Sequence, residues 1–212
     1  MSSNLYFLRH GETTHSQTGG YCGVLDPELT SSGQAMAEAF AAKYQSVDWS
    51  AIFSSPMNRT MATARPLCEA VGIEPQVRDG LKELNFGEWE DLVPEAVQEK
   101  YGQDYIKWLT EPAWNPPTGG ETAVQVASRA SLVLAEIEEA YPDGNVLVVS
   151  HKSTIRIMLC NLLGIDLGRY RDRIKMPVSS VTLVNFSVHG PMLKQLGDRS
   201  HLSDELRDRH EA

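Results

Sequence analysis

The sequence predicts a single α/β domain in which helices cover both faces of a mostly parallel sheet, a three-layer α/β/α arrangement. Three observations point to this fold: short β-like runs alternate with longer helical patterns, the chain has 212 residues, and 42% of them are hydrophobic. That size and composition suit one domain with a sizeable core. Alternating strands and helices are typical of parallel sheets, because each helix carries the chain back to begin the next strand. We therefore expect residues 1–212 to form one domain.

The first half of the chain supplies most of the predicted elements. NLYFL (4–8) is typical of a strand, and an apolar spacing of three to four residues predicts a helix over Ser31–Tyr44. AIFSS (51–55) is a second strand, and a helix is predicted over 57–71. EPQVR (74–78) is a candidate third strand.

The middle of the chain, residues 84–118, is the least regular part. Four prolines interrupt it, so we expect two short helices and a loop that form a small cap-like insertion. A long helix is predicted over 122–141, then the strand NVLVVS and a helix that reaches about Leu163. SSVTLVNF and PMLKQL are typical of closing strands. The charged tail, residues 197–212, is expected to be flexible.

Composition and charge argue against several classes of partner. The net charge is −9, and no basic stripe is visible, so a nucleic-acid partner is not expected. No apolar run approaches the roughly 18 residues of a membrane span, and the first residues do not resemble a secretory signal. We expect a protein that acts on a small molecule without membrane or nucleic-acid partners. The oligomeric state is left open, with a homodimer as one option.

The cysteines and histidines carry no signal for disulfides or metal. Three scattered cysteines favour reduced thiols and hence a cytoplasmic location. None of the six histidines belongs to an HxH or HExxH pair, so no metal site is expected. His15, His189, His201 and His210 are most simply surface or tail residues.

Polar residues of an unusual kind follow three predicted strands. NLYFL leads to Arg9 and His10, AIFSS leads to a segment with Arg59 near the start of a helix, and NVLVVS leads to His151. Ligands of such sheets bind outside the carboxyl ends of the strands, so these side chains would meet if the strands are neighbours. Arginines grip phosphate oxygens bidentately, and helix N-termini add N–H donors. The residues thus indicate an anion site, although each alone could be a solvated polar residue.

Five motifs in order resemble the histidine phosphatase superfamily, the phosphoglycerate mutase-like proteins: LRHGET, SSPMNRT, KELNFGEWED, TGGET and VVSH. The resemblance extends to about residue 186. It implies that His10 accepts the phosphoryl group on a ring nitrogen and that Arg9, Arg59 and His151 hold the phosphate oxygens. It also selects Glu83, among several acids of its motif, to protonate the leaving group and then activate water. It implies no metal or other cofactor.

Some positions depart from the family pattern and bear on substrate choice. The family usually has an Asn where this chain has Ser16, which we expect to hold the phosphate with one hydrogen bond and less reach. Cys22 stands where a Gln is common. Phe86 stands where metal-independent phosphoserine phosphatases of this superfamily have a histidine for the substrate carboxylate. Cys22, Phe86 and Gly120 are our candidate residues of the substrate pocket.

The resemblance favours a phosphatase over a mutase. The segment between Glu83 and Gly120 is short, and the acid is not followed by the RHYG-type stretch of cofactor-dependent phosphoglycerate mutases. A smaller cap favours hydrolysis, since a mutase must keep water from the phosphohistidine. We expect hydrolysis of a small phosphorylated metabolite: phosphoserine, a phosphoglycerate derivative or a sugar phosphate. The alternatives are a cofactor-dependent phosphoglycerate mutase, a phosphoprotein phosphatase and a non-catalytic phosphate-binding regulatory protein.

Overall fold

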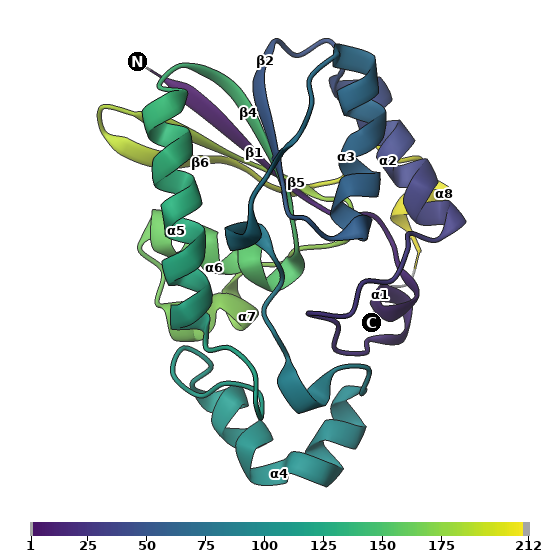
Figure 1. Cartoon of the computed structure of the whole chain (residues 1–212), viewed down its shortest axis with the longest axis vertical. Helices are drawn as coiled ribbons and strands as arrows, with labels where there is room; N and C mark the ends of the chain where they lie inside the picture. Colours follow the sequence, from purple (N-terminus) through teal and green to yellow (C-terminus); the bar gives the residue numbers. More distant parts are fainter. Residues whose placement is uncertain (1, 210–212) are drawn as a thin grey trace.

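One six-stranded sheet, with the order β3-β2-β4-β1-β5-β6, forms the centre of the protein (Figure 1). A computed structural model describes residues 2–209. The strands span Ser3–Arg9 (β1), Trp49–Ser54 (β2), Gln76–Val77 (β3), Gly144–Ser150 (β4), Val181–Ser187 (β5) and Gly190–Asp198 (β6). The first four run parallel to one another, whereas β5 is antiparallel to β1 and β6 to β5. The prediction of a mostly parallel sheet is therefore confirmed.

Helices cover both faces of this sheet, as the sequence predicted (Figure 1). They span Thr14–Thr18 (α1), Ser31–Tyr44 (α2), Asn58–Val71 (α3), Pro94–Thr110 (α4), Ala123–Ala140 (α5), Lys152–Leu163 (α6), Tyr170–Arg173 (α7) and Asp204–Arg207 (α8). On one face, Phe40 of α2 and Leu67 of α3 share a buried cluster with Ile52 of β2. On the other face, Leu134 of α5 clusters with Phe7 of β1. No helix described within residues 2–209 has the length and apolarity needed to cross a membrane.

Local sequence signals set the ends of the longer helices. The Thr30 side chain accepts the N–H of Gly33 at the start of α2, where it satisfies one of the unpaired N–H groups of the first turn. Thr122 and Gln125 cap the start of α5 reciprocally. α6 ends just before Gly164, whose φ of 66° is readily adopted by glycine. These signals explain why the sequence predicted the helix limits closely.

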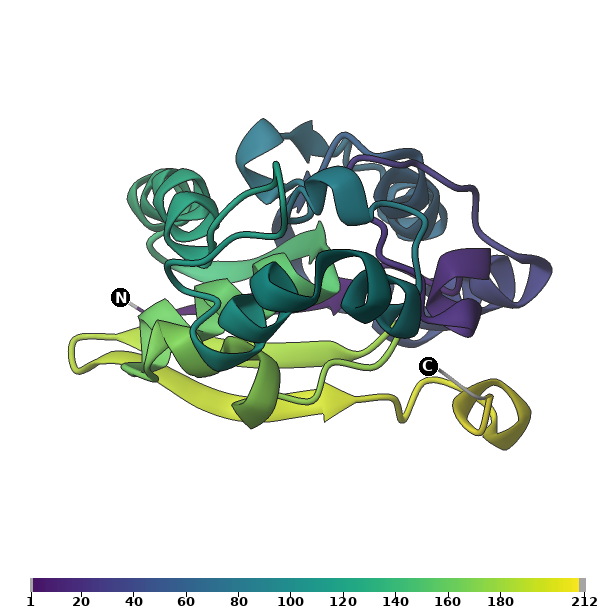
Figure 2. The ribbon, with the colours of Figure 1, turned by 90° about the horizontal axis from the view of Figure 1, so that it is seen from below.

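The middle of the chain folds into one kinked helix. The two short helices expected here are the halves of α4, joined at Tyr101, whose φ and ψ of −124° and 30° are not helical. Pro94 begins the helix, where a proline loses no hydrogen bond. The segment lies at the end of the molecule toward which the parallel strands run, and it crosses in front of them when viewed from below (Figure 2).

The last described residues lie against α1 and α2. Leu202 is buried beside Met36 of α2, and the guanidinium of Arg209 pairs with the Glu12 carboxylate at 2.7 Å. His201 packs edge-on against Phe40, with ring centroids 5.6 Å apart. His201 is thus a half-buried residue of the tail, because the chain turns back onto the domain after β6. Residues 210–212, with His210, lie outside the described part of the chain.

The packing of His201 predicts a loss of stability in acid. Burial lowers the pKa of this ring to about 4 from an ordinary value of 6.5. Between these two pH values the unfolded chain binds a proton that the folded chain does not, so stability is lost as the pH falls from 6.5 to 4. We expect His201→Gln to remove up to about 3 kcal/mol of this loss.

The measurement is urea unfolding at several pH values between 4 and 7. The wild-type free energy of unfolding should fall more steeply with acid than that of His201→Gln. His189→Gln is the matched control, because His189 is exposed in the turn between β5 and β6. Parallel pH curves for the wild type and His201→Gln would contradict the prediction.

Candidate active site

The carboxyl ends of three neighbouring strands bring two histidines and an arginine together. His10 follows β1, His151 follows β4 and begins α6, and Arg59 lies in the first turn of α3 after β2. Because β4 lies between β1 and β2, these residues converge. The rings of His10 and His151 are 5.2 Å apart, and Arg59 Nε donates to His151 Nδ1 at 3.2 Å.

His10 is buried and held in one orientation by its neighbour. Its Nδ1 lies 2.8 Å from the carbonyl oxygen of Gly11. A carbonyl can only accept, so Nδ1 carries the proton and Nε2 of the neutral ring has a free lone pair. Burial, followed by the charges of Arg59 and Arg9, lowers the pKa of His10 well below its usual value. The ring is therefore neutral and nucleophilic at neutral pH.

Gly11 is required by close packing behind His10. A Cβ on this residue would lie 2.5 Å from the carbonyl oxygen of Gly33, the residue at which α2 approaches this loop. The Gly11 N–H donates to the Thr63 hydroxyl of α3 at 3.0 Å. The glycine of RHGE thus lets the loop after β1 pass between α2 and α3, which fixes the position of the histidine.

His151 has the opposite tautomer. Because Arg59 Nε donates to Nδ1, that nitrogen accepts, and Nε2 donates to the Ser55 hydroxyl at 2.9 Å. Burial, followed by the charge of Arg59, lowers the pKa of His151 well below its usual value. His151 is thus a neutral ring that links the arginine of α3 to the loop after β2.

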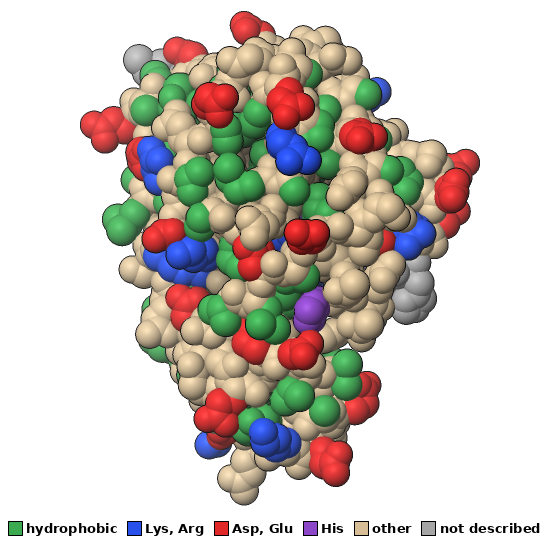
Figure 3. Space-filling view, turned by 45° about the vertical axis from the view of Figure 1, so that its right-hand side comes forward, with side chains coloured by type: hydrophobic (Ala, Val, Ile, Leu, Met, Phe, Trp, Pro, Cys, Tyr) green, Lys and Arg blue, Asp and Glu red, His purple; other side chains and the backbone are tan. Residues whose placement is uncertain are grey.

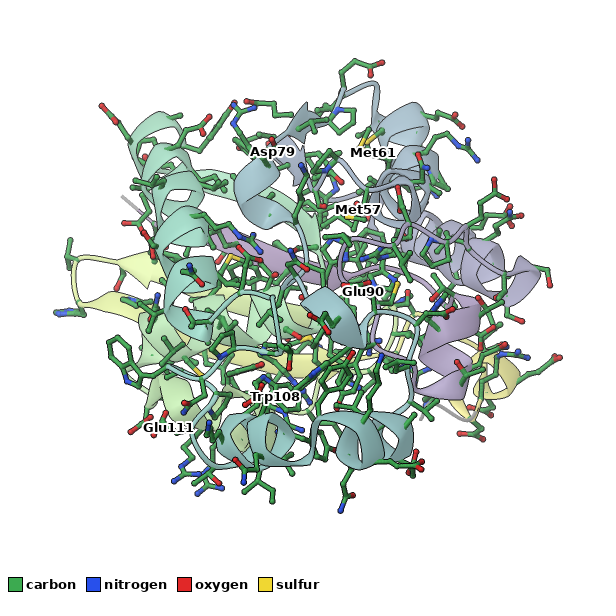
Figure 4. The ribbon with its side chains drawn as sticks, turned by 60° about the horizontal axis from the view of Figure 1, so that its bottom comes forward. Met57, Met61, Asp79, Glu90, Trp108 and Glu111 are labelled. Carbon is green, nitrogen blue, oxygen red and sulfur yellow. The ribbon has the colours of Figure 1, made fainter. Side chains whose placement is uncertain are left out.

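Arg59 is fully buried and oriented by the loop of residues 22–26. Its guanidinium donates to the carbonyls of Leu25 and Gly23, at 2.6 and 3.0 Å, and lies 3.4 Å from the Asp26 carboxylate. Glu90, which lies at the centre of the view in Figure 4, holds the same loop from its other side. Its carboxylate accepts the N–H groups of Gly23, Val24 and Leu25. Glu90 therefore positions the loop that orients Arg59.

Arg9 and Glu83 approach the site from other directions. Arg9 is 4% exposed, and its Nη1 donates to the carbonyl of Met176 at 2.6 Å. The Glu83 carboxylate lies at the start of α6, where its two oxygens accept the N–H groups of Ser153 and Thr154, each at 3.1 Å. The favourable end of the helix dipole thus holds a carboxylate beside the two histidines.

These side chains line a cavity of about 430 Å³, a size suited to a small ligand. His10, Arg9, Arg59 and Glu83 are part of its wall, but His151 is not. Many other acidic side chains are spread over the outer surface, as the face in Figure 3 shows. Within residues 2–209, no cluster of three or more His, Cys, Asp or Glu side chains is arranged to hold a metal ion.

Not all of the predicted pocket and phosphate-binding residues line the cavity with a free side chain. Cys22 and Phe86 line the cavity, and burial raises the pKa of the Cys22 thiol to about 11, so it stays protonated. Ser16 also lines it, but its hydroxyl accepts the Thr13 N–H and donates to the Thr13 carbonyl, each at 2.8 Å, and is thus used in capping α1. Gly120 is not part of the wall. Its missing Cβ would lie 2.3 Å from the Asn85 carbonyl, so tight packing explains this glycine.

Sequence reasoning missed several residues of the cavity wall. Lys152, Arg156, Tyr170 and Arg171 all line it, from α6 and α7. Lys152 and Arg156 are in the segment KSTIR, which follows the VVSH motif. The signal that could have identified these two residues is their spacing of four on a helix that begins at the site, which places both on one face of that helix. His15, taken as a surface residue, lies on the rim and pairs with Asp91 at 2.9 Å.

Comparison with known proteins decides the family. Residues 5–199 match the family described as "Histidine phosphatase superfamily (branch 1)". The chain belongs to the histidine phosphatase superfamily. The predicted family and fold are thereby confirmed.

Several similar proteins are named phosphatases. The chain is 31% identical over 208 residues to phosphoserine phosphatase 1 of Hydrogenobacter thermophilus, covering 98% of each chain. It is 29% identical over 174 residues to a glucosyl-3-phosphoglycerate phosphatase of Mycobacterium tuberculosis, covering 78% of each. The solved structure of a mycobacterial glucosyl-3-phosphoglycerate phosphatase has a TM-score of 0.86 at 25% identity, with 94% of this chain and 100% of that chain covered. These relatives confirm the prediction of a phosphatase enzyme.

Proposed function

We propose that this protein hydrolyses a small phosphomonoester through a phosphohistidine on His10, without a metal ion. The observation that carries the proposal is the hydrogen bond from His10 Nδ1 to the Gly11 carbonyl. It leaves the Nε2 lone pair available on a ring whose pKa is depressed by burial and by Arg59 and Arg9. The same two guanidinium groups can neutralise the charge of a phosphoryl group, which is the main requirement of this reaction.

In the first step, His10 Nε2 attacks phosphorus and the bond to the ester oxygen breaks. The protonated Glu83 carboxyl gives its proton to that oxygen, and an alcohol leaves. Transfer makes the His10 ring cationic, and the Gly11 carbonyl stabilises the remaining Nδ1–H. In the second step, water attacks phosphorus, the N–P bond breaks, and the Glu83 carboxylate takes a proton from the water. Phosphate leaves, and the ring returns to its neutral form.

The hydrogen bonds of Glu83 support its role in both steps. Oε1 accepts from the N–H groups of Leu84 and Thr154 and from the Thr154 hydroxyl, whereas among residues 2–209 Oε2 accepts only from the Ser153 N–H. Oε2 therefore retains the capacity to carry a proton toward the cavity. The position of Glu83 is fixed by α6, the helix that begins at His151.

Phosphate release by the purified protein in the presence of EDTA tests the proposal. We expect turnover of at least one of phosphoserine, a phosphoglycerate or a sugar phosphate, at the same rate with and without the chelator. Loss of activity with EDTA, restored by a divalent metal, would overturn metal independence. Conversion of 3-phosphoglycerate to 2-phosphoglycerate with bisphosphoglycerate present, and no phosphate release, would establish a mutase instead.

We further propose that the protein works in the cytoplasm on a soluble metabolite. Its three cysteines are free thiols, and burial raises the pKa of Cys68 and Cys160 to about 11. Thiols of this kind suit a reducing compartment. Fractionation of cells that carry a tagged protein tests the location, and recovery in a membrane or secreted fraction would contradict it.

A further inference from the structure

The cavity has a cationic wall in addition to the groups around His10. We use this name for Lys152, Arg156 and Arg171, which line the cavity from α6 and α7. Lys152 and Arg156 are four residues apart on α6, so they share one face of that helix. Ser153, whose N–H holds Glu83, lies on the same helix. Arg156 therefore lies about one helical turn beyond the residue that holds the Glu83 carboxylate.

Arg156 is half-buried and, within the described residues, lacks the anionic partner that a desolvated arginine normally has. Its Nε is buried, and no hydrogen-bond partner for that nitrogen lies within residues 2–209. Neither Arg156 nor Arg171 forms an ion pair with a carboxylate in the described part of the chain. Burial, followed by the charge of Arg9, lowers the pKa of Arg156. A desolvated guanidinium without a partner is unfavourable, so a bound anion would stabilise it.

The aromatic residues beside the cationic wall hold it in place. The Arg171 guanidinium lies 3.7 Å from the ring centre of Trp108, a cation–π contact between two residues that both line the cavity. Trp108 extends from α4 toward the body of the molecule (Figure 4). Tyr170 is 1% exposed and also lines the cavity. The wall is thus a packed surface, where an arginine loses little further freedom on binding a ligand.

We propose that the cationic wall, with Arg156 at its centre, binds a carboxylate of the substrate. The preferred substrates are then phosphomonoesters of small hydroxy acids or hydroxy amino acids. This inference rests on the proposed function, in which Arg9 and Arg59 take the phosphoryl group. A planar guanidinium matches the two oxygens of a carboxylate, and a cavity of about 430 Å³ suits a molecule that carries both groups. Phe86 stands where metal-independent phosphoserine phosphatases of this superfamily have a histidine for the carboxylate, and it carries no charge. In this proposal the cationic wall binds the carboxylate instead.

Two pairs of compounds that differ only in the carboxylate test the proposal. The pairs are 3-phosphoglycerate with glycerol 3-phosphate, and phosphoserine with phosphoethanolamine. The wild type should have a kcat/KM at least about tenfold higher for the carboxylated member of each pair, as expected for one charge-assisted contact. Arg156→Met should reduce this preference about 10- to 100-fold, mainly through KM, and Arg156→Lys should restore part of it.

Arg173→Met is the matched control, because it removes the same charge from an exposed residue of α7. It should leave the preference unchanged. Equal wild-type turnover of both members of each pair would overturn the inference and leave the proposed function intact. An equal loss for both members in Arg156→Met would also overturn it, since that pattern indicates a structural role. The wild-type kcat/KM for fructose 1,6-bisphosphate can also be compared with that for fructose 6-phosphate. If this ratio exceeds the preference for the carboxylated compounds, the wall binds a second phosphate, and the choice of a carboxylate is overturned.

A measurement that does not depend on turnover separates this inference from the proposed function. Calorimetry with the His10→Ala variant should show 3-phosphoglycerate binding at least about tenfold more tightly than glycerol 3-phosphate. Adding Arg156→Met should abolish that difference. If the wild type releases no phosphate from any compound, the proposed function fails, and this binding comparison still decides whether the cationic wall binds a carboxylate.

Discussion

Replacing His10 with Ala should abolish phosphate release from every substrate of the wild-type enzyme. The variant loses the only group that we propose as the nucleophile, and the remaining arginines cannot form a bond to phosphorus. A second readout is rapid acid quenching after mixing with a labelled substrate. The wild type should retain label on the protein as acid-labile phosphohistidine, and His10→Ala should retain none.

The control for this experiment has to address folding, because His10 is 6% exposed and packs against His151. His10→Asn keeps a polar side chain in the cavity and should be equally inactive with a near-normal Tm. His189→Ala changes an exposed histidine and should leave activity unchanged. Near-normal turnover by either folded His10 variant would refute the phosphohistidine mechanism.

Glu83→Gln should lower kcat for alkyl phosphates by about 10²- to 10⁴-fold, the range for losing general acid–base catalysis. The amide oxygen can take the place of Oε1 and still accept the Thr154 N–H, whereas the amide nitrogen at the Oε2 position cannot accept the Ser153 N–H. The change therefore removes proton transfer and one hydrogen bond but keeps the size of the side chain. An aryl phosphate separates the two steps. Its phenolate leaves without a proton, so phosphohistidine should form normally while its hydrolysis is slow.

We therefore expect Glu83→Gln to release one equivalent of p-nitrophenol per enzyme in a burst, followed by a slow steady state. Glu88→Gln is the matched control, because Glu88 is an exposed acid of the same motif and does not line the cavity. It should behave as the wild type. If Glu83→Gln slows the burst as much as the steady state, Glu83 has another role. If Glu88→Gln shows the burst instead, the acid was assigned wrongly.

Much of the fold follows from local sequence signals. The runs before Arg9 and before His151 are largely apolar on both faces, which is typical of strands covered on both sides in a parallel sheet. Caps and glycines set the helix ends within a residue or so, as in α2 and α5. The third strand is shorter than the predicted 74–78, because only Gln76–Val77 pairs with β2. It lies at the edge of the sheet, where fewer apolar residues are required.

The candidate site was predictable where its residues follow strands. His10 and His151 each come directly after a strand, so the parallel arrangement alone brings them to one edge. Glu83 could be selected only by resemblance to a family, because other acids lie beside it in the sequence. Its contacts with the start of α6 come from residues about 70 positions away, as in the Ser153 N–H bond.

By itself, the sequence determined the class of fold, the family and the residues at the strand ends, because these depend on local patterns and on motif order. The tertiary structure alone decided how those residues are used. It set the tautomers of His10 and His151, the packing of His201 against Phe40 and the place of Arg156 beside the cavity. The physical reason is that protonation state and desolvation depend on neighbours distant in the chain, which no local pattern contains.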